Sequence, residues 1–346
     1  MTSKEKVYNA LNFKEESFIP KFIWYSNKTK EFLEKKFNLH GPELEIYMGN
    51  DILQTWLSIN GEMERDVKDN TEFIDEWGIT WKRSGNYNMV IKHPLKNATL
   101  KNIEEYNLPN PLNPKRYEYF NFLINKYGQK YFIGADISGT IFEPSYHLMN
   151  MEDLLISMAY KDEKVDLLFD KVAEFSTAVG IEAIKKGADW IWLGDDLGSQ
   201  SGMIMSPDTW RHYLKPRMAK IIKTLRTQKS DIIIAYHSCG SMSDVIPDLI
   251  EIGINVLNPI QPLATNMDIY KIKNEYGSKI TLMGNIDTQD FMKNATPIEI
   301  RLQTKKLITN LKKGGGYIFA ASHTIQPDIP IENILAMVDE LKKEYK

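Results

Sequence analysis

The chain has 346 residues, of which 42% are hydrophobic, and a net charge of −3 at neutral pH. This length and apolar content suffice for a sizeable buried core, and the nearly balanced charge gives no electrostatic case for binding nucleic acid or an anionic membrane. The first residues contain no apolar run, so we expect no signal peptide, and no stretch is apolar for long enough to span a bilayer. Cys239 is the single cysteine, which excludes an intrachain disulfide and favours a reducing, cytoplasmic location.

Short apolar runs alternate with longer amphipathic segments along the chain. Continuous apolar runs bounded by turn residues predict strands buried on both faces. They are Ile19–Tyr25, the weaker candidate Asp51–Leu53, Tyr131–Ala135, Trp190–Leu193, Ile232–Tyr236, Ile254–Leu257, Ile280–Met283 and Tyr317–Ala321. The predicted helices between them include Glu152–Met158, Lys164–Lys186, Pro207–Arg226, Met242–Gly253, Met267–Tyr276 and Pro297–Lys313. Eight strand–helix units favour an α/β fold, a closed (β/α)8 TIM barrel rather than an open sheet.

The segment from Trp56 to Pro111 departs from this alternation. Within it, Trp77–Trp81 and Asn88–Ile91 are typical of a β-hairpin. We interpret the segment as an excursion from the barrel and not as a second domain. The sequence therefore predicts one domain over residues 1–346, a TIM barrel with an N-terminal helical and β-hairpin excursion.

Polar residues of chemical interest follow almost every predicted strand. The carboxyl ends of barrel strands meet at one mouth, where active sites of this fold are built. Solubility explains polar loops in general, but it does not favour Asp, His, Cys and Asn in particular. The candidate residues at the strand ends are Asp136, Asp195, Asp196, His237, Cys239, Asn258, Asn285, Ser322 and His323, and Glu143 and Gln261 lie shortly after strand ends.

His237 and Cys239 are the sharpest pair among these candidates. Alternate residues of an extended segment share a face, and imidazole and thiolate are both zinc ligands. With His323 as a third ligand and one open position, the set would resemble a catalytic zinc site. Two alternatives stay open: Cys239 is a small buried apolar residue, or it is a nucleophile activated by His237.

Asp195 and Asp196 form an adjacent pair of acids. Two carboxylates held close together usually orient a ligand or share a proton, so one of them is a candidate base or cation ligand. The alternative is that one caps the next helix. Glu143 is a candidate acid or metal ligand, and no glycine pattern in the chain matches a dinucleotide-binding or P-loop signature.

At these residues the chain resembles a known superfamily. The ordered motifs that carry the resemblance are Trp192–Gln200, Met205–Pro207, Tyr213–Pro216, His237–Gly240, Met283–Asp287 and the stretch from Gly315–Tyr317 to Gln326–Asp328. Together they are similar to the uroporphyrinogen decarboxylase-like superfamily, and the resemblance runs from about Lys6 to Tyr345. It implies a barrel enzyme and is much less specific for the reaction.

Two branches of the superfamily differ in their motifs. True decarboxylases carry an arginine-bearing motif after the first strand, but here 24–30 contains no arginine. The corrinoid-dependent methyltransferases bind zinc through the His and Cys of an H-x-C motif and a further Cys near the last strand. Here Ser322 and His323 occupy that last place, so the resemblance implies His237, Cys239 and His323 as the zinc ligands.

The methyltransferase branch is therefore the closer resemblance, and it implies a function. A methyl group would move between a small molecule, of the methyl ether, methylamine or thiol type, and the cobalt of a corrinoid carried by a partner protein. Corrinoid chemistry of this kind implies an anaerobic or strongly reducing cell, and a homodimer is compatible with the fold. In this interpretation Glu143, Asp195, Asp196 and Asn285 act on the substrate, and Asp136, Asn258 and Gln261 contact the cofactor.

Two other functions remain as alternatives. One is a decarboxylase of the uroporphyrinogen type, in which Asp195 or Asp196 stabilises a protonated pyrrole. The other is a barrel that binds corrinoid or substrate without catalysis.

Overall fold

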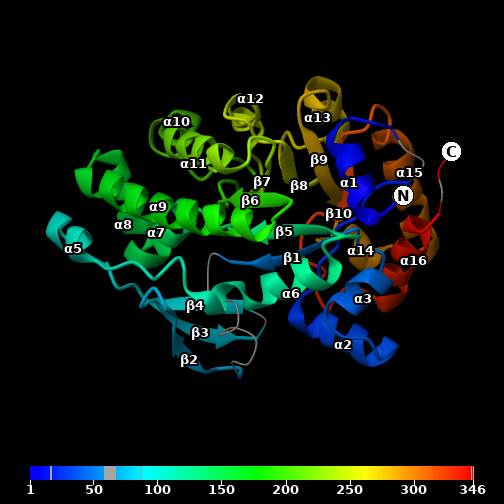
Figure 1. Cartoon of the computed structure of the whole chain (residues 1–346), viewed down its shortest axis with the longest axis horizontal. Helices are drawn as coiled ribbons and strands as arrows, with labels where there is room; N and C mark the ends of the chain where they lie inside the picture. The colour runs from blue at the N-terminus through cyan, green and yellow to red at the C-terminus, as the bar shows by residue number, and fades with distance from the viewer. Residues whose placement is uncertain (16–17, 58–67, 86, 344, 346) are drawn as a thin grey trace.

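The structure is a computed structural model that describes residues 1–15, 18–57, 68–85, 87–343 and 345. Seven parallel strands form a curled sheet in the order β1-β5-β6-β7-β8-β9-β10, with helices on its outside (Figure 1). The strands are β1 (Ile52–Trp56), β5 (Phe132–Asp136), β6 (Trp190–Gly194), β7 (Ile233–His237), β8 (Val256–Ile260), β9 (Thr281–Ile286) and β10 (Tyr317–Ala321). The predicted α/β-barrel class is confirmed.

The eighth position of the barrel holds residues 19–25, which form an extended segment and not a regular strand. Lys21 makes an isolated parallel bridge to β10, and its carbonyl oxygen accepts a hydrogen bond of 2.9 Å from the Asp51 amide just before β1. The side-chain amide of Asn50 bonds the N–H and C=O of Ile23 at 2.9 and 2.8 Å. A side chain thus replaces the backbone ladder on this edge, and for this reason the predicted first strand is irregular.

Several polar residues predicted to follow strands are the last residues of strands. Asp136 ends β5 and His237 ends β7, while Asn258 pairs with His237 in the β7–β8 register. A parallel ladder depends on backbone groups, so it continues past the point where side chains turn polar. These side chains are consequently fixed by a sheet and not by loops.

The helices largely follow the predicted segments. The predicted helix over 207–226 is divided after Tyr213, because Pro216 lacks an N–H and its ring is tolerated only in a first turn. The helices are α1 (Ser3–Leu11), α2 (Asn27–Phe37), α3 (Pro42–Tyr47), α5 (Leu100–Glu105), α6 (Glu118–Tyr127), α7 (Phe142–Met149), α8 (Met151–Ala159), α9 (Glu163–Lys186), α10 (Pro207–Tyr213), α11 (Lys215–Gln228), α12 (Ile246–Glu251), α13 (Ile269–Tyr276), α14 (Phe291–Asn294), α15 (Pro297–Leu311) and α16 (Ile331–Leu341), with 3-10 turns η1 (Pro114–Tyr117) and η2 (Ser243–Val245). In the described ranges, no helix has the length and apolar character that crossing a bilayer requires.

The predicted hairpin excursion is confirmed as a small antiparallel sheet of β2 (Glu72–Ile74), β3 (Thr80–Ser84) and β4 (Tyr87–Lys92). The first predicted strand starts later than expected, because the Asp75 carboxylate accepts hydrogen bonds of 2.9 Å from the amides of Trp77 and Ile79 and shapes a turn there. The described part of residues 56–111 therefore includes a three-stranded sheet beside the barrel (Figure 1).

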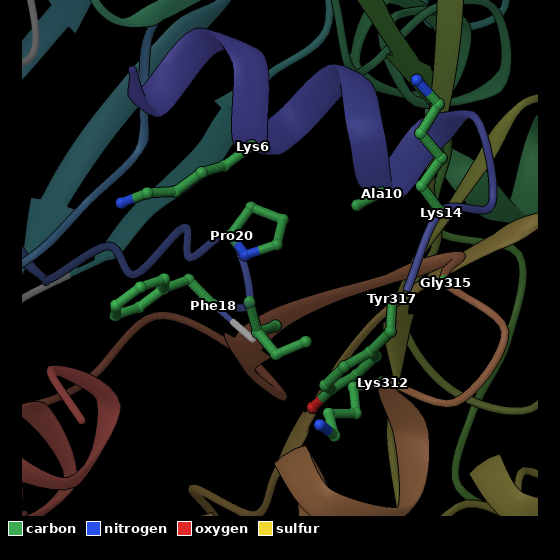
Figure 2. Close-up of a pocket in the computed structure, with 9 residues that line it drawn as sticks. Lys6, Ala10, Lys14, Phe18, Pro20, Lys312, Gly315 and Tyr317 are labelled. Atoms are coloured by element: carbon green, nitrogen blue, oxygen red, sulfur yellow. The ribbon is translucent and has the colours of Figure 1, made fainter. Parts of the chain in front are cut away.

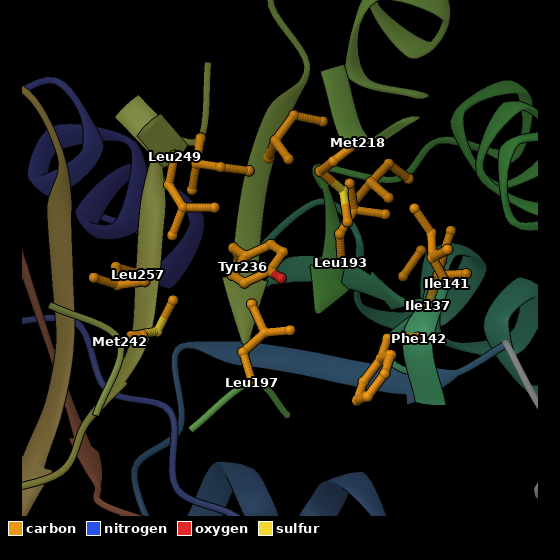
Figure 3. Packing of buried hydrophobic residues seen from close by; sticks show 14 of the residues in the cluster. Ile137, Ile141, Phe142, Leu193, Leu197, Met218, Tyr236, Met242, Leu249 and Leu257 are labelled. Carbon is orange, nitrogen blue, oxygen red and sulfur yellow. The ribbon is translucent and has the colours of Figure 1, made fainter. Parts of the chain in front are cut away.

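The core has an inner and an outer part. Inside the barrel, Phe22, Phe132, Trp190, Trp192 and Met283 pack together and fill the space below the mouth. Outside the sheet, strand residues such as Leu193 and Tyr236 pack against helix residues such as Met218 and Leu249 (Figure 3). Burying one large apolar side chain stabilises the fold by roughly 1.5–3 kcal/mol, so this core holds the strand ends in place.

Candidate metal centre and active-site cavity

Asp196, His237 and Cys239 come together at the carboxyl ends of β6 and β7. One ligand atom from each lies within 4.8 Å of the other two, and among the described residues this is the single group of its kind. The Nε2 atom of His237 is 3.6 Å from both Asp196 Oδ1 and Cys239 Sγ. This is the donor set of a transition-metal site, with one nitrogen, one sulfur and one oxygen.

The imidazole of His237 is held in one orientation. Its Nδ1 lies 2.8 Å from Oδ1 of the fully buried Asn258, which can only accept, so Nδ1 carries the proton and donates it. The lone pair of Nε2 therefore faces Asp196 and Cys239. On its other side the imidazole stacks on Trp192, with ring centroids 6.0 Å apart and planes 29° from parallel. A histidine ring oriented by a buried acceptor is typical of a metal ligand.

The loops that carry Asp196 and Cys239 are locked to each other. The backbone amide of Cys239 donates a hydrogen bond of 2.8 Å to Asp196 Oδ1. Gly240 has a left-handed backbone, with φ of 76°, and lies so close to Gly198 that a side chain on either residue would meet the other loop's backbone. Backbone contact between the two loops thus sets the spacing of Asp196 and Cys239.

The structure brings His237 and Cys239 together as predicted, and the third residue within reach of both is Asp196. We predicted His323, whereas Asp196 completes the group within 4.8 Å. Ser322 takes the buried position after β10, where its hydroxyl accepts a hydrogen bond of 3.1 Å from the Thr288 amide, and His323 lies on the wall of the cavity. His323 still lies in the field of the cluster, since burial and then the charge of His237 lower its pKa.

A cavity of about 690 Å³ opens beside the cluster, between the barrel mouth and the sheet of β2, β3 and β4. Asp196, Glu143 and His323 line it from the barrel side, and Trp81 and Arg83 line it from β3. The remaining lining residues are Tyr25, Ser26, Asn27, Trp56, Tyr87, Asn88, Gly139, Pro144, Tyr146, His147, Thr324 and Gln326. The volume is that of a site for a small molecule.

The acids of this region have strongly shifted pKa values. Burial, and next the charges of Asp196 and Asp195, raise the pKa of Glu143 well above its usual range. Burial raises the pKa of Asp136, against the hydrogen bonds from Ser138, and raises the pKa of the Cys239 thiol, which the charge of Asp196 raises further. Burial thus shifts these groups toward their protonated forms, and a bound cation would act in the opposite direction at the thiol.

Asp195 faces away from this cavity. It is 1% exposed, and its carboxylate accepts hydrogen bonds from the amides of Ile141, at 3.1 Å, and Glu143, at 3.0 Å, at the start of α7. The sequence left open that one acid of the pair caps the next helix; Asp195 instead serves the start of an earlier helix, and thereby holds Glu143. Its role on the substrate stays a prediction, and its contacts in the structure position the start of α7.

The other predicted residues take supporting places. Asp136 accepts a hydrogen bond of 2.9 Å from Gln54. Gln261 bonds the Gly240 amide at 2.9 Å through its Oε1 and ties the loop after β7 to the loop after β8. Asn285 is 5% exposed and lines a different cavity of about 390 Å³ that includes Asp287, so the structure does not bring it to the cluster.

The residues of the hairpin wall, such as Trp81 and Arg83, escaped sequence reasoning. No local pattern in the sequence of β3 predicts that this strand packs over the barrel mouth. Period-2 alternation does place Trp81 and Arg83 on one face of the strand, and the apolar Trp81 marks that face as the covered one. This alternation is the sequence signal from which the two wall residues could have been predicted.

His147, on the cavity wall, makes the fold sensitive to acid. Burial, and then the charge of His93, lower its pKa from 6.5 to about 4. A histidine whose pKa is lower in the folded state binds a proton more weakly there than in the unfolded state. The fold therefore loses stability as the pH falls from the unfolded pKa towards the folded pKa. We expect unfolding free energy to drop by about 2 kcal/mol from pH 7 to pH 5 through this residue. Urea unfolding at both pH values should show a smaller drop in His147→Gln, and an unchanged drop would contradict the assignment.

A smaller pocket lies at the opposite end of the barrel, under α1. Lys6, Lys14, Lys312 and Tyr317 line it (Figure 2). Its volume is about 10 Å³, enough for little more than a water molecule. It is therefore not a candidate for the active site.

Curated proteins are similar to part of this chain in sequence. One curated relative is a uroporphyrinogen decarboxylase from Vesicomyosocius okutanii, 27% identical over 53% of this chain and 50% of that protein. Another is the methylcobamide:CoM methyltransferase MtaA from Methanosarcina barkeri, 26% identical over 54% of this chain and 52% of that protein. The matched part thus spans about half the length of these relatives.

A solved structure extends the similarity to the whole chain. It is a methyltransferase from Methanosarcina mazei, with a TM-score of 0.75, 18% identity and coverage of 99% of this chain and 98% of that one. At this identity the likeness shows the barrel fold. The family described as uroporphyrinogen decarboxylase (URO-D) matches residues 78–344, so the chain belongs to the URO-D family.

Proposed function

We propose that this protein is a methyltransferase that moves a methyl group between a small molecule and the cobalt of a corrinoid carried by a partner protein, in a reducing compartment of the cell. The observation that carries the proposal is the group of Asp196, His237 and Cys239, in which a buried Asn258 leaves His237 Nε2 free. A relative whose name describes methyl transfer from a methylcobamide supports it.

The residues of the cluster fit a zinc ion. Imidazole, thiolate and carboxylate are its protein ligands, and three of them leave one position for substrate. Asp196, His237 and Cys239 would hold the ion, and it would supply Lewis acidity that lowers the pKa of a thiol or polarises a methyl ether oxygen. A bound cation would offset the raised pKa of the Cys239 thiol, since a neighbouring positive charge stabilises the thiolate.

The other residues bind and orient the substrate. Glu143 lines the cavity with a raised pKa, so at neutral pH it is suited to donate a hydrogen bond from a protonated carboxyl. Asp195 fixes the start of the helix that carries Glu143. Trp81 closes the cavity from the hairpin side and limits the water around the reacting group.

The decarboxylase alternative fits the cavity less well. A porphyrinogen carries many carboxylates, which are best held by several forked, charge-assisted donors. Among the cavity-lining residues that the structure describes, Arg83 is the one arginine, and no lysine is present. We therefore place decarboxylation second, although several curated relatives are named uroporphyrinogen decarboxylase.

One experiment separates the two reactions. The purified protein is given methylcobalamin with a set of thiols, and separately cob(I)alamin with methyl ethers and methylamines, while cobalt absorbance is followed. The same preparation is given uroporphyrinogen, and released CO2 is measured. We expect a change at cobalt that depends on the small molecule. Decarboxylation of uroporphyrinogen without any change at cobalt would refute the proposal.

Asn258 provides a test of the metal assignment. Asn258→Ala removes the acceptor of the His237 Nδ1–H bond, so the ring loses its fixed orientation. Loss of such an orienting group costs about 10–100-fold in metal affinity. Competition with a chromophoric chelator should show this loss in Asn258→Ala. Asn285→Ala, a buried asparagine away from the cluster, is the control and should keep the wild-type affinity. Equal affinities in all three proteins would contradict the assigned role.

A further inference from the structure

The pocket of about 390 Å³ lies between α13 and α15, the helix before β9 and the long helix after it (Figure 1). The loops after β8 and β9 complete its wall, with Leu263 from the first loop and Asp287 and Phe291 from the second. Its described lining residues include none of those that line the cavity at the barrel mouth. The volume is within the range of sites for small organic molecules. This pocket is therefore a separate candidate binding site.

Asn285 places an amide without a hydrogen-bond partner in the wall of this pocket. The residue belongs to β9, lies opposite Ala320 of β10 in the register, and is 5% exposed. Its side chain forms no hydrogen bond with any described residue, although it lines the pocket. The buried Asn333, by contrast, donates to the carbonyl oxygens of Met292 and Ala295, at 2.9 and 2.8 Å. A buried amide is normally hydrogen-bonded, so the amide of Asn285 is available to a ligand.

The wall of the pocket is acidic. Asp268, Asp287 and Asp290 line it, and none of the described lining residues is a lysine, arginine or histidine. Asp287 is occupied in shaping the loop after β9, because its two oxygens accept hydrogen bonds from the amides of Gln289, Asp290 and Phe291, at 3.0, 2.9 and 2.8 Å. The other two aspartates are left to give the pocket its charge.

Asp268 and Asp290 each have one carboxylate oxygen to spare. Oδ1 of Asp268 accepts from the first amides of α13, at 2.8 and 3.2 Å, and Oδ1 of Asp290 accepts from the Asn294 side chain at 2.7 Å. Over the part of the chain that the structure describes, neither aspartate forms an ion pair, and Lys293 is paired with Asp328 at 2.7 Å instead. The negative charge of the pocket is thus not neutralised by the protein.

The shape of the wall favours an organic cation over a metal ion. The carboxylate oxygens of the three aspartates do not all lie within 4.8 Å of one another, and among the described residues the cluster at β6 and β7 is the one group that does so. Between the acids the wall is apolar, with Ile269 and Leu307 only 2% and 1% exposed. Tyr270 and Phe291 add aromatic rings, whose faces attract cations.

We propose that this pocket binds a small organic cation with N–H donors, a protonated amine or guanidinium on an apolar body. The cationic group donates a hydrogen bond to the amide oxygen of Asn285, and the carboxylates of Asp268 and Asp290 balance its charge. The apolar body packs on Leu307 and Phe291. The inference goes beyond methyl transfer and does not depend on it.

Calorimetric titration of the whole protein at pH 7 tests the chemistry of the ligand. The probes are benzylamine, benzylguanidine, the neutral benzyl alcohol, and benzyltrimethylammonium, which is charged but has no N–H donor. A charge-assisted hydrogen bond contributes about 10- to 100-fold in affinity. We expect benzylamine or benzylguanidine to bind more tightly than the last two probes by that factor. Equal binding of all probes, or no binding of either N–H cation, would overturn the proposal.

Variants assign the binding to this pocket. Asn285→Ala should weaken the preferred cation by about 10- to 100-fold. The double variant Asp268→Asn, Asp290→Asn should remove the preference for a charged probe, and because both residues are exposed and asparagine also caps helices, the fold should be kept. Asp162→Asn, at the N-cap of α9 and outside the pocket, is the matched control and should bind as the wild type does. Unchanged cation binding in Asn285→Ala or in the double variant would contradict the assignment.

Discussion

Cys239→Ala should lose bound zinc and at least about 100-fold in methyl-transfer rate, since removing a direct ligand costs no less than removing an orienting group behind one. The chain holds a single cysteine, so no other thiol can replace it. Zinc per protein is measured by mass spectrometry on protein purified without a histidine tag. The wild type should carry about one equivalent, in keeping with the single cluster among the described residues.

A second variant separates the metal from the fold. Asp196→Asn keeps the shape of the side chain and an oxygen that can accept the 2.8 Å bond from the Cys239 amide, but it removes the negative charge. We expect weaker zinc binding and an unchanged melting temperature in zinc-free buffer. Full zinc content in Cys239→Ala would show that the protein binds zinc at a site other than this cluster.

Gly240→Ala should cost more stability than any other substitution proposed for this chain. Alanine in a left-handed backbone costs about 1–2 kcal/mol, and φ here is 76°. The added Cβ would also overlap the backbone of Gly198 and Ser199, which adds about 1–3 kcal/mol for an overpacked contact that backbone atoms cannot relieve. Because Cys239 and Asp196 are carried by the two loops that meet here, zinc affinity should fall together with stability.

Gly202→Ala is the matched control. It lies in the same loop region, but a Cβ there would meet nothing within 4 Å and the backbone is not left-handed. Urea unfolding should show a change below about 0.5 kcal/mol for this variant. If Gly240→Ala unfolded at the same urea concentration as Gly202→Ala, the close approach of the two loops would not exist in solution.

The alternation of apolar runs and amphipathic segments was enough to predict the barrel. It worked because strands buried on both faces and helices buried on one face leave different periods in the sequence. It overstated the regularity of residues 19–25, where Asn50 takes the place of a backbone partner. A side chain can replace a backbone partner in this way only where two distant segments meet in space, and this leaves no local pattern in the sequence.

The sequence predicted which two residues of the cluster lie together, but not the third. His237 and Cys239 are separated by one residue, so their shared face followed from the sequence. Asp195 and Asp196 are adjacent and therefore point to opposite sides. Which of the two faces α7 depends on how that helix packs, and in the structure it is Asp195. His323 was proposed as the third ligand from the resemblance, which places a metal ligand after the last strand, whereas the proximity of Asp196 to His237 and Cys239 depends on contacts between the loops after β6 and β7.

The most direct test of the account links the cluster to the reaction. Protein freed of metal by a chelator is reloaded with zinc in steps, and methyl transfer from methylcobalamin to a thiol is measured at each step. The account predicts a rate that rises in proportion to bound zinc, levels off at one equivalent, and is not restored in His237→Ala. A metal-free protein that transfers the methyl group as fast as the reloaded one would contradict it.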